Sequence, residues 1–188
     1  MPNNDAQKIT AQPQGSRLSH WLRIAAVGRN PKRTLKRISV LVGASILIFK
    51  FILLPVRIDG ISMSPTYKDH AIDFVNRLAY FIHQPKRGDV VGIRAGGTNY
   101  IYRTPGVMYM KRILGLPGET VRFSLGHVLI NGKPLAEPYE KGPCDWNSVP
   151  VRVGTNQYFV VGDNRSMPEE YHYHGRVEKQ QIVGRVLY

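Results

Sequence analysis

The chain has 188 residues, 43% of them hydrophobic, and a formal net charge of +13. Residues 57–188 hold 17 basic and 12 acidic side chains, whereas the first 37 residues hold eight basic side chains against Asp5 alone. Because the excess charge is concentrated in this tail and no nucleic-acid-binding motif is present, we expect no nucleic-acid partner. The single cysteine, Cys144, excludes an intramolecular disulfide.

Residues 38–56 form the apolar stretch of membrane length, with Lys50 as its one charge. As a helix rising about 1.5 Å per residue, this run would reach roughly 29 Å, close to the ~30 Å thickness of the hydrocarbon core of a bilayer. Lys50 lies toward its C-terminal end, where the long side chain can extend to the interface. A secretory signal peptide fits less well, because the run starts late and lacks an Ala-x-Ala exit. The sequence therefore predicts a transmembrane helix over residues 38–56.

The basic residues that precede this run predict its orientation. Most of them lie within about 20 residues of the span, where positive charge keeps a segment in the cytoplasm. We expect residues 1–37 to be a basic cytoplasmic tail and the chain to cross the inner membrane once. Residues 57–188 would then form one extracytoplasmic or periplasmic domain.

The pattern of residues 57–188 predicts a mainly β fold, because short apolar runs alternate with turn residues. Residues 90–93, 128–130 and 158–161 read as strands. Asn131-Gly132 predicts a type I′ hairpin turn, and Leu116-Pro117-Gly118 fits a type II turn. A further strand over residues 107–114 would be apolar on both faces and therefore buried.

That buried strand would carry Lys111, and Ser62 follows the apolar run in Gly60-Ile61-Ser62-Met63-Ser64-Pro65. A serine hydroxyl is a poor nucleophile unless a neighbouring base takes its proton. Lysine can act as that base if its pKa falls from ~10.4 to about 8, a change of roughly 3 kcal/mol that apolar burial can supply. Ser62 and Lys111 are therefore candidate nucleophile and general base. His172-x-His174 is too weak a pattern for a metal site, and we expect neither a metal nor a cofactor.

Three segments occur in the order seen in type I signal peptidases: the serine segment, Lys111-Arg112-Ile113-Leu114-Gly115 and Gly162-Asp163-Asn164-Arg165. The chain resembles that family over residues 38–188. The resemblance implies the coiled β-sheet catalytic domain of that family behind one N-terminal transmembrane helix. It implies an extracytoplasmic serine endopeptidase that removes signal peptides from secretory preproteins after Ala-x-Ala-like motifs.

The resemblance also implies roles for individual residues. Ser62 is the nucleophile, Lys111 is the base, and the oxyanion is held by the Ser62 N–H together with a backbone donor or water at Gly60. Arg112 and Asp163 match a structural ion pair near the base, beside Asn164. The apolar wall of the substrate pocket is expected from Ile58, Met63, Tyr109 and Met110.

The segment after Arg165 departs from the family pattern Asn-Ser-x-Asp-Ser-Arg. Pro168 occupies the place of the serine that supports the base lysine, and Ser166 is the candidate to replace it. Glu170 and His172 fall where an acidic residue and an arginine are expected.

Three other functions stay open on the sequence. One is a specialised peptidase that processes pilins or other conjugation proteins, and another is a self-cleaving repressor of the same serine-lysine clan, against which the apolar run argues. The third is a membrane-anchored domain that binds peptides without cutting them. The expected partners are secretory preproteins and the lipid bilayer, which exposed side chains around Phe81-Ile82 could also touch, and the expected state is a monomer.

Overall fold

The computed structural model describes residues 30–94, 108–139 and 144–187. The first 29 residues of the predicted basic tail, and Val107 in the predicted buried strand, lie outside these ranges. The chain divides between Ile46 and Leu47 into two units.

The helix α2 (Pro31–Leu47) lies in the N-terminal unit except for its last residue, and the π-helical segment η1 (Ile48–Ile52) belongs to the C-terminal unit. The helical conformation ends at Ile52, before the predicted end of the apolar helix at Val56, because residues 53–57 form a strand. Pro31 suits the first helical position, where a backbone N–H has no partner within the helix in any case. Among the residues that the structure describes, no helix combines the length and the apolarity needed to cross a membrane.

The C-terminal unit is mainly β, as the sequence predicts. After η1, its elements in chain order are β1 (Leu53–Arg57), β2 (Ile72–Asn76), α3 (Ala79–Ile82), β3 (Val90–Arg94), β4 (Met108–Gly115), β5 (Thr120–Ser124), β6 (His127–Ile130), β7 (Lys133–Pro134), β8 (Val151–Arg152), β9 (Gln157–Val161), η3 (Glu169–Tyr171), β10 (Gly175–Glu178), η4 (Lys179–Gln181) and β11 (Ile182–Val186). These strands form a seven-stranded sheet in the order β1-β2-β11-β3-β4-β9-β10 and a four-stranded sheet in the order β7-β6-β5-β8.

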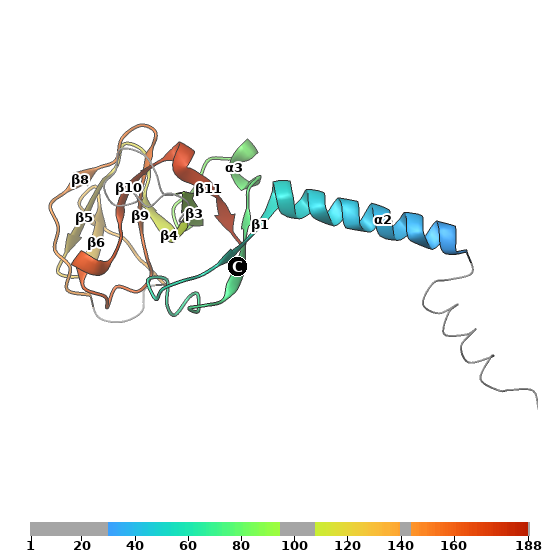
Figure 1. Ribbon diagram of the computed structural model, residues 1–188. Coiled ribbons are helices and arrows are strands. Elements are labelled where there is room, and N and C mark those ends of the chain that lie inside the picture. Colours follow the sequence, from blue (N-terminus) through green and yellow to red (C-terminus); the bar gives the residue numbers. More distant parts are fainter. Residues whose placement is uncertain (1–29, 95–107, 140–143, 188) are drawn as a thin grey trace, which may run out of the picture. The chain divides into compact units, whose positions relative to one another are not determined.

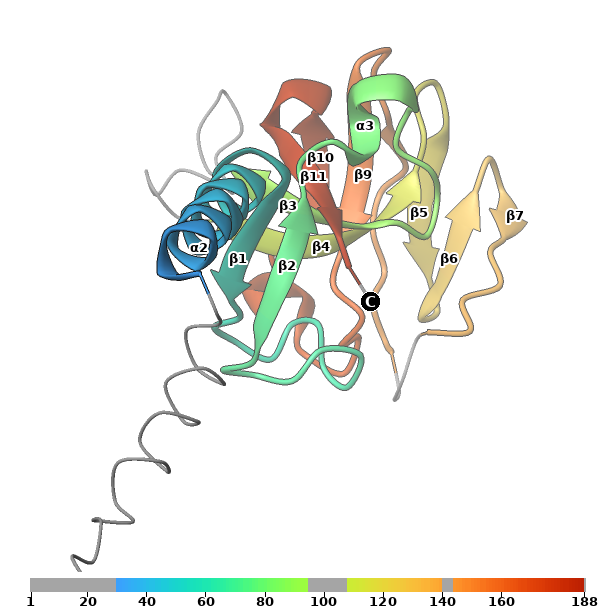
Figure 2. The same ribbon diagram turned by 90° about the vertical axis from the view of Figure 1, so that its right-hand side faces the viewer.

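Neighbouring strands pair antiparallel in both sheets. Figure 1 shows the smaller sheet, with β5, β6 and β8, at the opposite end of the domain from β1. Figure 2, turned by 90°, shows the same separation, with β7 at one side and β1 and β2 at the other. The larger sheet therefore carries β1 and β4 in one continuous framework, with β4 near its centre.

The turns form where the sequence predicts them. Asn131 and Gly132 both have positive φ, 50° and 78°, as a type I′ turn requires, and they connect β6 to β7. Gly118 has a φ of 85°, and the Glu119 N–H donates to the Leu116 carbonyl at 3.1 Å, which closes the predicted turn before β5.

Three apolar clusters form the core of the domain. One joins the two sheets, with Phe123 of β5 and Phe159 of β9 among its buried members. A second packs between β3, β4, β9 and β10. The third lies beneath the segment that follows β1 and includes Ile58, Met63 and Val75. Fully burying a side chain of this kind contributes about 1.5–3 kcal/mol, so this cluster holds the Ser62 segment against the sheet.

Candidate active site

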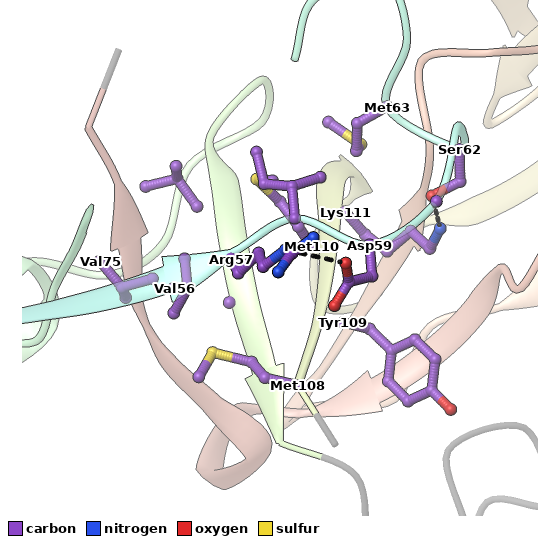
Figure 3. A pocket seen from close by; sticks show the side chains of 14 residues that line it. Val56, Arg57, Asp59, Ser62, Met63, Val75, Met108, Tyr109, Met110 and Lys111 are labelled. Carbon is purple, nitrogen blue, oxygen red and sulfur yellow. Dashed lines mark hydrogen bonds and ion pairs between the residues drawn. The ribbon is translucent and has the colours of Figure 1, made fainter. Parts of the chain in front are cut away.

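Ser62 and Lys111 meet, although 49 residues separate them in the sequence. Ser62 lies in the turn after β1, and Lys111 lies in β4, whose neighbours β3 and β9 flank it in the sheet. The Lys111 Nζ donates to the Ser62 Oγ at 2.6 Å, as the dashed line in Figure 3 shows. The lysine side chain points out of the sheet toward the serine, and the lysine residue is only 2% exposed.

Burial lowers the pKa of Lys111 from 10.5 to about 8, and the negative charge of Asp163 opposes that shift. The charged ammonium loses hydration in this setting, which favours the neutral amine. A substantial fraction of Lys111 is therefore unprotonated near pH 8. A neutral amine within hydrogen-bond distance of a serine hydroxyl is what a lysine base needs.

A groove with a cavity volume of about 420 Å³ opens beside the two residues. The side chains expected at the pocket wall, Ile58, Met63, Tyr109 and Met110, all line it, and Ser62 and Lys111 lie on its surface. Figure 3 shows the segment that follows β1 passing over β3 and β4, with Tyr109 and Met108 to one side.

The groove is lined by parts of β1 and β4 that have no neighbouring strand on one side, among the described elements. β1 is the terminal strand of its sheet and pairs only with β2. In β4, residues 108–111 pair with β3 on one side, whereas pairing with β9 begins only at Arg112. Unpaired backbone groups on two facing edges can receive an extended peptide.

Arg112 and Asp163 form the ion pair that the sequence suggests. The guanidinium donates to both carboxylate oxygens, at 2.8 and 2.6 Å, and Asp163 is fully buried. Arg112 also lies over the ring of Tyr139, 4.0 Å from its centroid. The pair ties the segment that follows β9 to β4, at the residue next to Lys111.

Gly60 does not present a free backbone donor. Its N–H donates to the Asp69 Oδ1 at 2.7 Å, and this hydrogen bond is the main reason that the pKa of the Asp69 carboxyl lies below 3.8. The Ser62 N–H, by contrast, makes no hydrogen bond within the described parts of the chain. The Ser62 amide is therefore the better candidate for an oxyanion donor.

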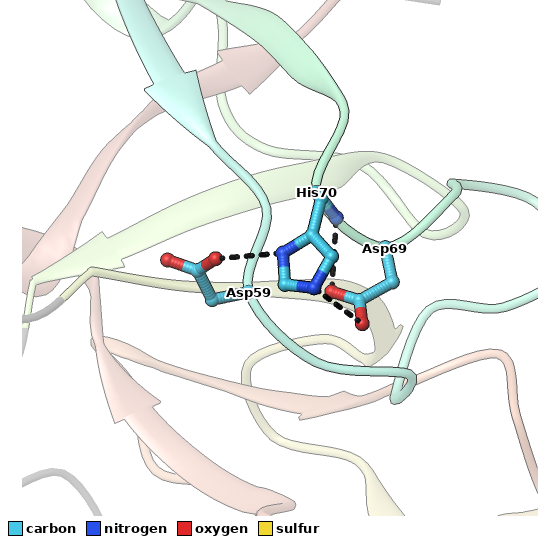
Figure 4. A group of neighbouring side chains, drawn as sticks. All are labelled: Asp59, Asp69 and His70. Atoms are coloured by element: carbon cyan, nitrogen blue, oxygen red, sulfur yellow. Dashed lines mark hydrogen bonds and ion pairs between the residues drawn. The ribbon is translucent and has the colours of Figure 1, made fainter.

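Asp59, Asp69 and His70 form a surface cluster next to Gly60 (Figure 4), with ligand-type atoms within 4.8 Å of one another. The His70 Nδ1 lies 3.3 Å from Asp59, and its Nε2 lies 3.5 Å from Asp69. All three residues are exposed and satisfy one another. Exposed acidic groups often gather in this way without an ion, so we assign no metal to the cluster.

Ser166 lies on the surface, and its hydroxyl donates to the Asn164 Oδ1 at 2.6 Å. The contact that the structure gives it is thus with Asn164 and not with Lys111, the base it is predicted to support. Asn164 in turn contacts the Ser62 segment.

Two residues that the sequence motifs include, Arg165 and His172, are buried near the site, which the sequence does not predict. Arg165 is fully buried and pairs with Glu137 at 2.5 and 3.1 Å. His172 is 2% exposed, and its ring nitrogens make no hydrogen bond of ordinary geometry within the described residues, although the nearby Ser62 backbone contributes to the pKa of the ring. Burial, with the positive charge of Lys111 as a second cause, lowers the pKa of His172 to about 3, so the ring is neutral. Only the family comparison of the segment after Arg165 draws attention to this position.

A serine hydroxyl that is hydrogen-bonded to a buried lysine, in a groove between open strand edges, is the arrangement required of a serine hydrolase with a lysine base. Comparison with known proteins identifies a peptidase family. The chain belongs to the signal peptidase family, peptidase S26, whose family model matches residues 32–188.

Individual relatives carry the same name. The chain is 37% identical over 160 residues to signal peptidase I T of Bacillus subtilis, covering 79% of each protein. It is 36% identical over 129 residues to signal peptidase I of Leptolyngbya laminosa, which covers 67% of this chain and 63% of the relative. For a probable signal peptidase I-2 of Synechocystis the identity is 35%, and the chain spans 57% of that relative's length.

Among solved structures, a signal peptidase I from Enterococcus faecalis matches 56% of this chain and 99% of its own, at 26% identity and a TM-score of 0.44.

Proposed function

We propose that this protein is a serine endopeptidase that removes signal peptides from secretory preproteins, with Ser62 as nucleophile and Lys111 as general base. The observation that carries the proposal is the 2.6 Å hydrogen bond between a serine in a peptide-sized groove and a lysine buried enough to be neutral near pH 8. Membership of the signal peptidase family supports the choice of substrate.

The reaction follows from the geometry in two halves. Neutral Lys111 takes the Ser62 proton as the Ser62 Oγ attacks the scissile carbonyl carbon, and the Ser62 N–H stabilises the oxyanion that forms. The Lys111 ammonium then gives its proton to the leaving amine, so that the peptide C–N bond breaks and an acyl-enzyme remains. A water molecule, deprotonated by Lys111, hydrolyses the ester and releases the signal peptide.

An extended substrate would add its backbone to the open edges at Arg57 and Asp59 and at residues 108–111. Ile58 is not an open position, because both of its backbone groups already bond to Ala71 and His70. Ile58 and Met63 are almost completely buried, at 7% and 2% exposure, and they contribute only a shallow apolar surface to the groove. Small side chains such as alanine would fit beside them without displacing core residues. Cleavage after Ala-x-Ala is therefore the expected specificity, and efficient cleavage after bulky residues would contradict it.

We propose that the apolar run from residue 38 to Ile52 anchors the chain in the inner membrane, with residues 1–37 in the cytoplasm. The catalytic domain outside then begins with β1, because residues 53–56 of the predicted span pair with β2. The support is the single charge in the apolar run, the basic residues before it, and the exposed apolar side chains between Val40 and Phe51. Phe81 and Ile82 are also 86% and 83% exposed, and they offer a second apolar contact for lipid.

A dedicated substrate, such as a pilin, is the second candidate function. The altered segment after Arg165 favours it, because Tyr173 in this segment packs edge-on against Tyr109, a groove residue, at 5.5 Å between ring centroids. A preprotein panel that includes pilin-type precursors would separate a general peptidase from a dedicated one.

The test is cleavage of a model preprotein by the full chain in detergent, next to Ser62→Ala and Lys111→Met. Lys68→Met serves as a matched control, since Lys68 is exposed and lies on the same segment as Ser62. Cleavage after Ala-x-Ala that is lost in the first two variants and kept in the control would support the proposal. Cleavage that survives Ser62→Ala would refute the assignment of the nucleophile.

A further inference from the structure

Asn164 contacts both sides of the nucleophile from the far end of β9. Its side-chain Nδ2 donates to the Ile61 carbonyl at 3.0 Å, across 103 residues of sequence. Its backbone N–H donates to the Ser62 carbonyl, also at 3.0 Å. One residue therefore contacts both carbonyl groups that flank the Ser62 Cα, and it shares the Ile61 oxygen with the Ser64 N–H, which donates to it at 3.0 Å from within the turn.

The hydrogen bond to the Ile61 carbonyl also affects the direction of the Ser62 N–H. The Ile61 C=O and the Ser62 N–H belong to the same planar trans peptide unit, in which the two groups point in opposite directions. Fixing the carbonyl thus fixes the direction of the Ser62 N–H. That N–H is the proposed oxyanion donor, and it has no partner among the described residues.

Ser166 stabilises one of the two possible orientations of the Asn164 side-chain amide. A carbonyl oxygen can only accept hydrogen bonds, so the amide must turn its NH₂ group toward Ile61. This leaves the Oδ1 on the other side, where the Ser166 hydroxyl donates to it at 2.6 Å. Ser166 therefore stabilises the amide orientation that the Ile61 contact needs.

Gly162 allows this close approach. A Cβ atom on Gly162 would lie 2.1 Å from the Ser62 carbonyl oxygen and 2.7 Å from the ring of His172. The glycine thus brings the backbone of the segment after β9 against the nucleophile, within reach of Asn164.

We propose that Asn164 is a positioning residue that orients the peptide unit carrying the oxyanion donor, and that Ser166 acts on catalysis through Asn164 and not through Lys111. The inference rests on the proposed peptidase function, because it assigns a task within that reaction. Asn164 touches neither the substrate nor the reacting atoms.

The experiment measures kcat and KM of the full chain in detergent for an Ala-x-Ala peptide substrate, using Asn164→Ala, Asn164→Asp, Ser166→Ala and the double variant Asn164→Ala/Ser166→Ala. Asn147→Ala is the matched control, because Asn147 also bonds two backbone groups, at Leu125 and Asp145, away from the site. Losing an oxyanion donor costs about 10²–10³ in kcat, so a misdirected one should cost about 10- to 100-fold, with KM nearly unchanged.

A second readout is the affinity of a peptide aldehyde ending in alanine, which forms a hemiacetal with the nucleophile and places an oxygen where the oxyanion lies. Its affinity should fall in parallel with kcat/KM in both Asn164 variants, while affinity for the cleaved product peptide stays constant. Asn164→Asp retains the side-chain volume, so a loss of activity at an unchanged unfolding midpoint would not be a folding defect.

The double variant distinguishes the two roles of Ser166. If Ser166 acts through Asn164, the double variant is no slower than Asn164→Ala alone. Additive losses, with a shifted acid limb of the pH profile in Ser166→Ala, would show that it supports Lys111 and would overturn that part of the inference. Full kcat in Asn164→Asp, with an active unmodified enzyme, would refute the inference and leave the proposed function intact. An unmodified chain that does not cleave would refute both.

Discussion

Replacing Lys111 with methionine should abolish cleavage and at the same time stabilise the fold. The lysine residue is 2% exposed, and its pKa falls from 10.5 to about 8 on burial. At 1.36 kcal/mol per unit of pKa, keeping the charged lysine buried costs about 3 kcal/mol below pH 8. Methionine has a similar length and carries no charge, so Lys111→Met removes that cost.

The loss of the hydrogen bond to Ser62 offsets part of the gain, by about 1 kcal/mol. We therefore expect the variant to be more stable at pH 7 by about 2 kcal/mol. Between pH 8 and pH 10.5 the unfolded chain binds a proton at this position that the folded chain does not, so the unmodified protein gains stability over that range. The advantage of Lys111→Met should shrink accordingly, reach zero at about pH 9.5 and become a disadvantage of about 1 kcal/mol at pH 10.5, where only the lost hydrogen bond remains.

Urea unfolding of both proteins in the same detergent, followed by circular dichroism from pH 7 to pH 10.5, measures this difference. Comparing the two proteins at each pH removes the contributions of the other titrating groups. A stability difference that does not change with pH, or a variant less stable than the unmodified protein at pH 7, would refute the claim that Lys111 is held with a lowered pKa.

Three further outcomes are expected. Activity, measured as kcat/KM, should rise with pH through about 8 and then level off, because only neutral Lys111 can take the serine proton; a flat profile between pH 6 and pH 9 would contradict this. Gly162→Ala should lower kcat at least 10-fold in the peptide assay, because its Cβ would lie 2.1 Å from the Ser62 carbonyl oxygen and the nucleophile would have to move. Normal turnover would show that the segments around Gly162 and Ser62 can separate freely. Glu137→Gln should destabilise the fold by about 3 kcal/mol in urea unfolding, because it leaves the fully buried Arg165 without a carboxylate partner; a change below 0.5 kcal/mol would mean that water reaches the guanidinium.

Local sequence patterns predict much of this fold because they report local geometry. The apolar runs at residues 90–93 and 158–161 became β3 and β9, and the turns at Asn131-Gly132 and Leu116-Pro117-Gly118 formed as expected. The proximity of Ser62 and Lys111 came from the family resemblance. No periodicity joins two residues so far apart in the sequence.

The contacts that the sequence did not predict are all long-range and polar. The pairing of Glu137 with Arg165, and the contact of Asn164 with Ile61, depend on how the segments after β7 and β9 meet the rest of the domain. A charged or amide side chain in a loop usually stays in water, so its residue type gives no sign of burial. The burial of His172 could not be predicted either, because it depends on the packing of Trp146 against the His172 ring.

The hydrogen bonds at the nucleophile have a consequence for biosynthesis. Ser62 needs Lys111, which is synthesised 49 residues later, and Ile61 is held by Asn164, 103 residues after it. If Ser62 and Lys111 act as proposed, an emerging or truncated chain has the serine but not its base, and activity arises only when these distant segments have come together. On the proposed mechanism, the specific activity of a preparation would therefore report the fraction of molecules in which these distant segments have come together.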